Sequence, residues 1–400
     1  MTGRRILISG ASIAGPALAH WLHVYGMTSV VVERHDGIRP GGQTVDLRGA
    51  GRTVARRMGI EDAVRAASTG EDGVAFVDAR DRVKAAFAAE AFGGEGLVAE
   101  SEILRGELAR LLHGCTRVHT EYVFGDRITA VDDRDDEVRV SFAHGPDRAF
   151  DLVVAADGIG STTRGLVFGT EARVVPLGLY MSYLTIPRAA SDGSWARWHN
   201  GPGGRVVALR PDNLGTTRAL MSFLCPPRGY ERLPVGEQKE LLRRVFDGVG
   251  WEAPRVLRAL DAADEFYLEL VGQVHAPRWS RGRVALVGDA GYCASPISGM
   301  GTSLALVGAY VLAGELAAHA SHRDAFRSYE RIMRPYVAQA QHLPPFVPRV
   351  AHPRSRFGIG VLNALLATAA NPALHRIARR VLTPPAEKID LPDYARLRPR

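Results

Sequence analysis

Three short segments of this 400-residue chain combine glycines with an acidic residue in patterns that suit dinucleotide binding. The first is Gly10-Ala11-Ser12-Ile13-Ala14-Gly15, a variant of GxGxxG with Ser12 at the second glycine position. Gly10 permits a tight turn, and Gly15 permits close packing of a helix on a strand. Glu33 stands 23 residues after Gly10, at a spacing typical of the acid that binds a ribose. A pyrophosphate would then lie on the free backbone N–H groups of Ser12, Ile13 and Ala14.

The second and third segments each place an acid at the end of an apolar run. Asp157-Gly158 follows the run 151–155, a pattern equally typical of an ordinary strand-to-turn junction. Gly288-Asp289 follows the run 283–287, so Asp289 would lie at the carboxyl end of a strand, where ligands of α/β sheets collect. A glycine-rich turn and a helix come next, and the positive helix start suits a developing negative charge. The turn comprises Pro296, Gly299, Met300, Gly301 and Thr302.

The elements that must position these segments follow from apolar patterning and turn signals. The first forty residues predict a strand at Ile6–Ser9, a helix at Pro16–Tyr25 and a strand at Ser29–Glu33. Ser101 resembles an N-cap for a helix at Glu102–His113. Further strands are expected at Val118–Phe124, Ile128–Asp132, Val138–Phe142, Asp151–Ala155 and Arg283–Val287, with a long helix from about Gly301.

The middle of the chain has a different character. Turn signals there separate short strand candidates such as Arg205–Leu209 and Ala219–Cys225, with helices at Glu237–Phe246 and Pro254–Ala262. We therefore expect an α/β protein whose Rossmann-like domain is discontinuous, with an inserted mixed or antiparallel sheet domain and a C-terminal helical region. The predicted divisions are 1–72, 98–173 and 271–330 for the first domain, 73–97 and 174–270 for the second, and 331–400 for the last.

Composition narrows the class of protein. The formal net charge is +7, but no block of five basic residues accompanies it, so we expect no nucleic-acid partner. Three separated cysteines and scattered histidines predict neither a disulfide framework nor a metal site. No signal peptide or membrane span is predicted, since the apolar stretch 303–320 contains Glu315 and is typical of a buried helix. A cytoplasmic location is the resulting expectation, and the oligomeric state stays open.

Together the three segments resemble FAD-dependent monooxygenases of the aromatic-hydroxylase class, the p-hydroxybenzoate hydroxylase fold family, over residues 4–330. The length is similar to that of the short tetracycline-degrading and polyketide-tailoring members. The resemblance implies that the first segment holds the ADP half of FAD, that Asp157 and Gly158 support the pyrophosphate region, and that Gly288 and Asp289 hold the ribityl chain. It also adds FAD contacts from Glu33-Arg34 and Arg105, and weaker flavin-side candidates in Asp46 and Arg48. Two positions depart from the family: Tyr292 stands where histidine is frequent, and Thr302-Ser303 where asparagine is frequent.

The same resemblance implies a reaction. NADPH or NADH would reduce FAD, O₂ would add at the flavin C4a, and the resulting hydroperoxide would transfer one oxygen atom to an aromatic or polyketide-like molecule. Hydroxylation in natural-product tailoring or antibiotic modification is the favoured interpretation, and no protein nucleophile or general base is identified. Two alternatives stay open: an FAD-dependent oxidase or dehydrogenase, and a catalytically silent protein that binds FAD or substrate.

Two further features concern surfaces. The inserted sheet should cover the substrate, and five of its aromatic residues could stack on a planar ring, although each is more typical of a core: Tyr180, Tyr183, Trp195, Trp198 and Phe223. The segment Phe357–Leu382 has apolar residues near helical spacing. It could touch a membrane or a partner, but a helix packed back on the enzyme is the favoured interpretation.

Overall fold

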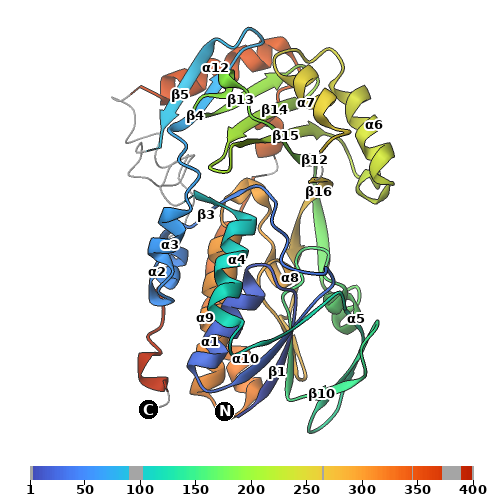
Figure 1. Ribbon diagram of the computed structural model, residues 1–400, viewed down its shortest axis with the longest axis vertical. Helices are drawn as coiled ribbons and strands as arrows, with labels where there is room; N and C mark the ends of the chain where they lie inside the picture. The colour runs from blue at the N-terminus through green and yellow to red at the C-terminus, as the bar shows by residue number, and fades with distance from the viewer. Residues whose placement is uncertain (1–2, 90–101, 264, 345, 372–388, 399–400) are drawn as a thin grey trace.

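A computed structural model describes residues 3–89, 102–263, 265–344, 346–371 and 389–398. It contains two large sheets, one above the other in Figure 1, with a smaller three-stranded sheet beside the lower one. The α/β fold class predicted from the sequence is confirmed. Ser101, the predicted helix cap, and the end of the predicted segment 357–382 lie outside the described residues.

The lower sheet is parallel except at one edge. Its strand order is β17-β18-β11-β1-β2-β7, and only β17 runs antiparallel to its neighbour. The central strands form because short runs such as Ile6-Leu7-Ile8 are apolar on both faces, which suits a sheet covered on both sides. The strands span Ser280–Arg281 (β17), Val284–Leu286 (β18), Leu152–Ala155 (β11), Arg5–Ser9 (β1), Thr28–Glu33 (β2) and Glu121–Phe124 (β7).

Helices cover one face of this sheet around a central apolar helix. Residues Gly301–Ala318 form α9, which is apolar all round and buried over most of its length. It is the one described helix long and apolar enough to cross a membrane by composition, and its burial identifies it as a core helix. It packs against α1, α2 and α10. The helices of this layer are α1 (Ala14–Val24), α2 (Gly49–Arg57), α3 (Glu61–Ala66), α4 (Arg105–Thr116), α8 (Asp289–Tyr292) and α10 (His322–Gln341).

On the other face, α5 (Thr162–Phe168) lies near a three-stranded antiparallel sheet. That sheet is ordered β10-β9-β8, with strands at Arg148–Phe150, Val138–Phe142 and Ile128–Asp133. The predicted hairpin between the second and third of these strands is confirmed.

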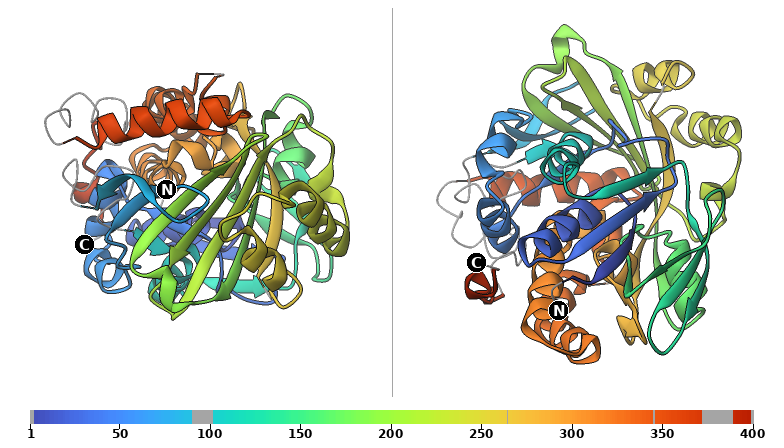
Figure 2. Two further views of the ribbon diagram at one scale, coloured as in Figure 1. Left: turned by 90° about the horizontal axis from the view of Figure 1, so that it is seen from above. Right: turned by 60° about the horizontal axis from the view of Figure 1, so that its bottom comes forward.

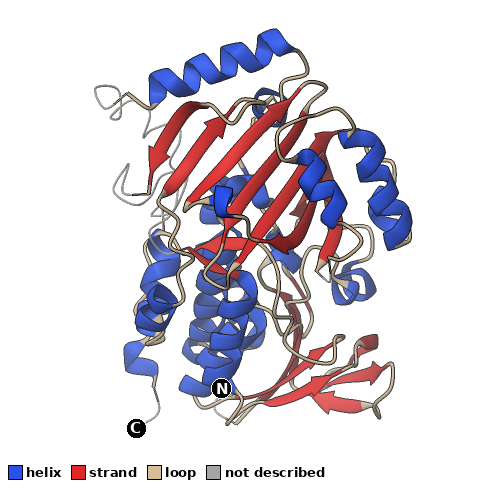
Figure 3. Ribbon diagram, turned by 45° about the horizontal axis from the view of Figure 1, so that its top comes forward, coloured by secondary structure: helices blue, strands red, loops and turns tan. Residues whose placement is uncertain are grey.

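The upper sheet has seven strands in the order β16-β12-β15-β14-β13-β4-β5. All neighbours are antiparallel except β13 and β4, so the sheet is mixed (Figure 3). The strands span Phe266–His275 (β16), Arg173–Pro187 (β12), Thr216–Leu224 (β15), Arg205–Pro211 (β14), Trp195–Gly201 (β13), Gly73–Val77 (β4) and Val83–Ala88 (β5).

The two faces of the seven-stranded sheet have different coverings. The face that packs under α6 (Val235–Phe246) and α7 (Ala253–Ala259) is called the outer face. The inner face carries Met181, Tyr183 and Val271, and it contacts Ile297 from the region of the third glycine segment. Helix α12 (Arg356–Ala369), preceded by α11 (Val347–Ala351), lies across from α6 and α7 when the molecule is seen from above (Figure 2, left).

Several predicted boundaries are wrong by a few residues, and one is wrong in kind. Residues Glu102–Leu104 form the short strand β6, which pairs with β3 (Thr44–Asp46), and the helix begins only at Arg105. The carboxylate of Glu102 pairs with Arg210 of the seven-stranded sheet, and this contact favours the strand. Local sequence patterning does not report such a long-range contact. The first helix begins at Ala14 rather than Pro16, and β7 begins at Glu121 rather than Val118.

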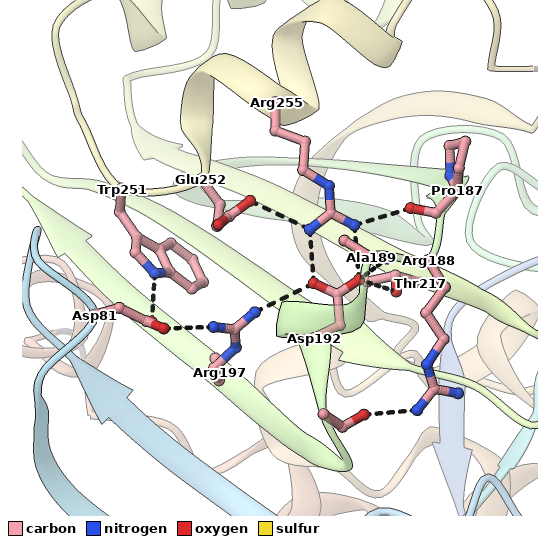
Figure 4. A network of polar contacts seen from close by, with 11 residues as sticks. Asp81, Pro187, Arg188, Ala189, Asp192, Arg197, Thr217, Trp251, Glu252 and Arg255 are labelled. Carbon is pink, nitrogen blue, oxygen red and sulfur yellow. Dashed lines mark hydrogen bonds and ion pairs between the residues drawn. The ribbon is translucent and has the colours of Figure 1, made fainter.

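A buried ion-pair network fastens α7 and β13 to the turn before β13 (Figure 4). Asp192 is 2% exposed and accepts hydrogen bonds from Arg255 at 2.6 Å, Thr217 Oγ1 at 2.7 Å, Ala189 N at 2.9 Å and Arg197 at 3.2 Å. Burial alone would raise the pKa of Asp192, but the hydrogen bonds outweigh it and bring the pKa to about 2. The carboxylate is therefore charged at neutral pH and holds three elements together.

We predict that Asp192→Asn lowers the free energy of unfolding by about 3 kcal/mol, because it removes the buried carboxylate that Arg197 and Arg255 share. Each arginine then keeps only its outer partner, Asp81 for Arg197 and Glu252 for Arg255. Urea denaturation at pH 7 measures the change. Asp261→Asn is the matched control, since Asp261 is 78% exposed and its pair with Arg243 should contribute less than about 1 kcal/mol. Equal effects of the two substitutions would contradict this role. Because the pKa of Asp192 is lowered, its contribution should be lost only as the pH falls toward 2.

Candidate functional site

The turn between β1 and α1 is built so closely that only glycine fits at two positions. Gly10 has φ +107°, and a Cβ there would lie 2.6 Å from the carbonyl oxygen of Ala156 on the neighbouring strand. A Cβ on Gly15 would lie 1.9 Å from the carbonyl oxygen of Gly10. The backbone of residues 10–15 is therefore pressed against the sheet, which leaves the start of α1 open on its other side.

The donors and acceptors at this turn suit a dinucleotide. The N-cap of α1 is Ile13, which has no side-chain acceptor, and the first turn contains no acidic residue. Its N–H groups are thus left for an anion such as a pyrophosphate. Glu33 reaches the turn from the end of β2, where its carboxylate accepts hydrogen bonds from Ala11 N at 2.9 Å and His35 N at 3.1 Å. Arg34, the next residue, is exposed.

Arg105 joins this turn to the loop before β3. It is the first residue of α4, and its guanidinium donates to Ser12 Oγ at 3.0 Å and to the carbonyl oxygen of Gly41 at 2.9 Å. Gly42 has φ +120°, and a Cβ there would lie 2.5 Å from Arg105 Nε. Burial lowers the pKa of Arg105, but a guanidinium stays charged at neutral pH. A positive charge therefore stands beside the helix start.

The Asp157-Gly158 segment supports the site through its neighbours. The Asp157 carboxylate accepts hydrogen bonds from Ser161 Oγ and from Thr163 N and Oγ1, so it fixes the start of α5. Arg164 in α5 donates to the carbonyl oxygen of Ala290 at 3.0 Å, which ties this segment to the third one. A Cβ on Gly158 would meet no atom within 4 Å, so open space adjoins the turn.

The third segment brings a buried acid to a second helix start. Asp289 begins α8, and its Oδ1 lies 3.9 Å from the position a Cβ would take on Gly301, the first residue of α9. The first turn of α9 has no side-chain cap and no acidic residue of its own. Burial raises the pKa of Asp289 above its ordinary value. Between Asp289 and α9, Pro296 opens a short 3-10 turn, Pro296–Ser298, and Gly299 closes it at φ +62°.

The first and third segments form one site. A Cβ on Gly288 would lie 3.0 Å from the Cβ of Ala14, so the two glycine turns touch. Behind them, Ser303 of α9 accepts a hydrogen bond from Arg48 N and donates to the carbonyl oxygen of Arg48, each at 3.2 Å. Met300 and Thr302 are buried at the start of α9. The two uncapped helix starts and the Arg105 guanidinium can donate hydrogen bonds, and the Glu33 carboxylate can accept them, a set that fits FAD.

Asp46 and Arg48 lie in a buried polar network rather than alone beside the site. The two side chains pair with each other at 2.7 Å. Asp46 also faces Glu102 across β3 and β6, and Glu102 and Glu71 both bind Arg210 of the inner sheet face. Burial raises the pKa of Glu102 well above its ordinary value, in spite of Arg210. This network connects the short β3–β6 pair to the seven-stranded sheet.

Tyr292 stands where histidine is frequent in the family, and the packing around it explains this difference. Tyr292 is 1% exposed, and its hydroxyl forms a hydrogen bond of 2.9 Å with that of Tyr329 in α10. The hydroxyl lies where a Cβ on Gly308 of α9 would be, 1.9 Å away, so Gly308 makes room for the ring. Tyr292 is therefore a core residue.

The inner sheet face carries an aromatic layer that faces the glycine segments. Tyr183 and Tyr267 stack with ring centroids 4.9 Å apart, and Ile297 packs in the same cluster. Tyr267 also donates from its hydroxyl to Gln43 Oε1 at 3.2 Å, in the loop that holds Arg105. Strand register places Trp198 on this face in the same row, next to Phe76.

The other three predicted stacking residues are placed differently. Tyr180 and Phe223 stack on each other in the core beneath α6 and α7, which is the placement that the sequence favoured over contact with a substrate. Trp195 is three residues before Trp198 in β13, so it lies on the opposite, outer face, as Arg197 does. Alternation along a strand decides these positions, and it could not be oriented before the covering helices were known.

A buried acid on the inner face was not identified from the sequence. Glu269 lies in the row after Tyr267 and directly opposite Met181, which places its side chain on the inner face. Its Oε1 is buried and has no hydrogen-bond partner in the described structure. Burial and the nearby Asp289 raise the pKa of Glu269 to about 7. A single acid within an otherwise apolar strand was the available signal.

We predict that Gly15→Ala weakens FAD binding at least tenfold and lowers the free energy of unfolding by about 1–3 kcal/mol, because the new methyl group overlaps the Gly10 carbonyl. Equilibrium dialysis of FAD and urea denaturation measure the two effects. The control is Gly114→Ala in α4, where a Cβ meets no atom within 4 Å and alanine should be neutral or stabilising. Full FAD affinity in Gly15→Ala would count against this site.

Comparisons with known proteins agree with this geometry. The profile of the FAD binding domain family matches residues 4–342. A flavin-dependent monooxygenase from an unknown prokaryotic organism is 36% identical over 399 residues, covering 98% of this chain and 99% of that protein. The flavin-dependent monooxygenase eupH of Phoma sp is 34% identical over all of both chains. The crystal structure of tetracycline destructase Tet(51) superposes with a TM-score of 0.83 at 30% identity, covering 98% of this chain and 100% of that one. The chain therefore belongs to the FAD-binding family of flavin-dependent monooxygenases.

Proposed function

We propose that this protein inserts one oxygen atom from O₂ into a planar aromatic or polycyclic small molecule, with NADPH or NADH as reductant. The observation that carries the proposal is that the aromatic layer of the inner sheet face meets the third glycine segment, whose Ile297 packs against it. Similarity to a tetracycline destructase, whose name refers to a polycyclic compound, supports the same substrate class. Natural-product tailoring or antibiotic modification is the setting that fits it.

Within this proposal the chain binds and orients, and the cofactor supplies the redox chemistry. Bound FAD would draw electrons from the nicotinamide and activate O₂. The start of α1, Glu33 and Arg105 would hold the dinucleotide, and Asp289 with the start of α9 would hold its flavin end. Tyr183 and Tyr267 stack with the substrate ring and exclude water. Stacking of aromatic rings contributes about 0.5–1.5 kcal/mol beyond the burial of their surface area.

Glu269 is the group we propose to take a proton from the substrate. Its carboxyl lies on the same sheet face as the stacked tyrosines, and one oxygen is buried without a partner. A phenol donates electrons to an electrophilic oxygen more readily after the phenol loses its proton. A proton acceptor on this sheet face would therefore assist the transfer of oxygen. A pKa of about 7 suits a general base near neutral pH.

The reaction is tested with purified protein, FAD, NADPH or NADH, and a panel of phenols and polycyclic aromatics. We expect substrate-stimulated oxidation of the nicotinamide and a product heavier by one oxygen atom, labelled from ¹⁸O₂. Nicotinamide oxidation with hydrogen peroxide as its only product would instead identify an oxidase. Absence of FAD binding would refute the whole proposal.

For Glu269→Gln we predict a loss of about 100-fold in kcat/KM for a phenolic substrate, since the amide cannot accept the proton. The wild-type profile of kcat/KM should rise through pH 7 as the carboxyl ionises, and the variant should lack this inflection. Stability gives a second readout. Because the pKa of Glu269 is raised, wild type should lose stability relative to the variant as the pH rises from 5 to 8.

The control for this variant is Glu240→Gln, on α6, where the carboxylate is 55% exposed and pairs with Arg243. It should leave both pH profiles unchanged. An unchanged pH–rate profile in Glu269→Gln would exclude Glu269 as the proton acceptor while leaving the monooxygenase proposal in place.

A further inference from the structure

Helix α12 breaks the usual relation between apolar composition and burial. Its fourteen residues, Arg-Phe-Gly-Ile-Gly-Val-Leu-Asn-Ala-Leu-Leu-Ala-Thr-Ala, contain a single charge, at Arg356, yet none of them is buried. A helix that is apolar all round is normally enclosed, either in a protein core or in lipid. α9 follows this rule and α12 does not.

One face of α12 accounts for part of its apolar surface. Leu366, Ala369 and Ala370 pack against a cluster on the inner sheet face, made by Val74, Ala85, Phe87 and Ala196. The sequence favours a helix packed back on the enzyme, and this face does so. Figure 1 shows α12 beside β4 and β5, at the end of the molecule farthest from both termini.

The other face of α12 is an exposed apolar stripe. Phe357 is 82% exposed, Val361 44% and Leu365 61%, and their spacing of four residues keeps them on one side of the helix. Just before α12, Phe346 and Val350 are 61% and 50% exposed. Large exposed apolar patches of this kind mark contact surfaces rather than ordinary solvated faces.

The charged residues that neighbour the stripe along the chain are all positive. No aspartate or glutamate occurs between Glu330 and Glu387. Arg349, Arg354 and Arg356, which flank the apolar residues, are exposed. Apolar side chains flanked along the chain by arginines complement a surface that is negative outside and apolar beneath, which is the character of an anionic lipid bilayer.

We propose that α12 and the end of α11 form a peripheral docking site for anionic membranes, with Phe357, Val361 and Leu365 inserted at the level of the headgroups. A fourteen-residue helix is about 21 Å long, too short for the roughly 30 Å hydrocarbon core, so it lies in the surface. A stripe of that length and about 10 Å wide covers roughly 200 Å², far less than the roughly 800 Å² per partner of a stable protein dimer.

The site would also place the enzyme where apolar molecules accumulate. Ala196, which contacts α12, is two residues from Trp198 on the same sheet face. Membrane docking through α12 would thus bring the aromatic layer close to the bilayer. This last point rests on the proposed function, whereas the docking site itself does not.

The test is co-sedimentation of the full-length protein with sucrose-loaded vesicles. We expect binding to vesicles of equal phosphatidylcholine and phosphatidylglycerol, and weaker binding to pure phosphatidylcholine or at 0.5 M salt. The double substitution Phe357→Ser with Leu365→Ser should reduce the partition coefficient at least tenfold, since two large apolar side chains are lost. Arg349→Gln and Arg356→Gln should each reduce it about fivefold, on the anionic vesicles only.

The matched control is Val118→Ser, because Val118 is 82% exposed, as Phe357 is, but lies between α4 and β7. It should bind vesicles as wild type does. Circular dichroism and FAD binding verify that each variant is folded. Three results would overturn the proposal: no vesicle binding by wild type, unchanged binding in the Phe357/Leu365 variant, or a dimer in light scattering that the same variant abolishes.

Discussion

The structure depends on one close approach, that of the α1 start to β1 and β11. The carbonyl oxygen of Gly10 occupies the space that a side chain on Gly15 would need, and the carbonyl of Ala156 does the same at Gly10. Because no side chain intervenes, the first turn of α1 lies directly over the carboxyl ends of the central strands. Ala14 then meets Gly288, and so the third glycine turn is brought to the same point from a strand almost 300 residues further along the chain. The uncapped N–H groups at the start of α1 are therefore left for a bound dinucleotide, with Glu33 and Arg105 beside them.

Charged residues hold the parts of the molecule around this point. Arg105 links the first turn to the loop at Gly41, Arg164 links the second segment to the third, and Arg210 links the inner sheet face to Glu102. Each guanidinium donates to two or more acceptors, many of them backbone carbonyls. A planar group with five donors serves this purpose better than lysine, because it can bind two separate elements at once. The abundance of arginine in the chain therefore has a structural use, at least at these positions.

The seven-stranded sheet separates two environments by alternation alone. Along β12, Tyr180 and Tyr183 differ by three positions and so lie on opposite faces, one in the core under α6 and α7 and one toward the glycine segments. Glu269 shares the second face, where burial keeps its carboxyl neutral below about pH 7. The same face continues to β4, where α12 covers its end. The third glycine segment, the aromatic layer and the exposed apolar helix thus adjoin the same sheet face.

Motif spacing and apolar patterning were enough to predict the cofactor, the fold class and the order of the three segments. Glycine spacing after short apolar strands reports local geometry, because the carbonyl of Gly10 excludes a side chain at 15 and the φ of +107° favours glycine at 10. The sequence also identified Glu33 and Arg105, and the tertiary structure then defined their contacts at the first turn. Long-range packing settled which aromatic residues face the site, that Glu102 belongs to a strand, that Tyr292 is a core residue, and that one carboxylate oxygen of Glu269 is buried without a hydrogen-bond partner. Those outcomes depend on contacts between residues far apart in the chain, and periodicity along one strand cannot say which of its two faces another element will cover.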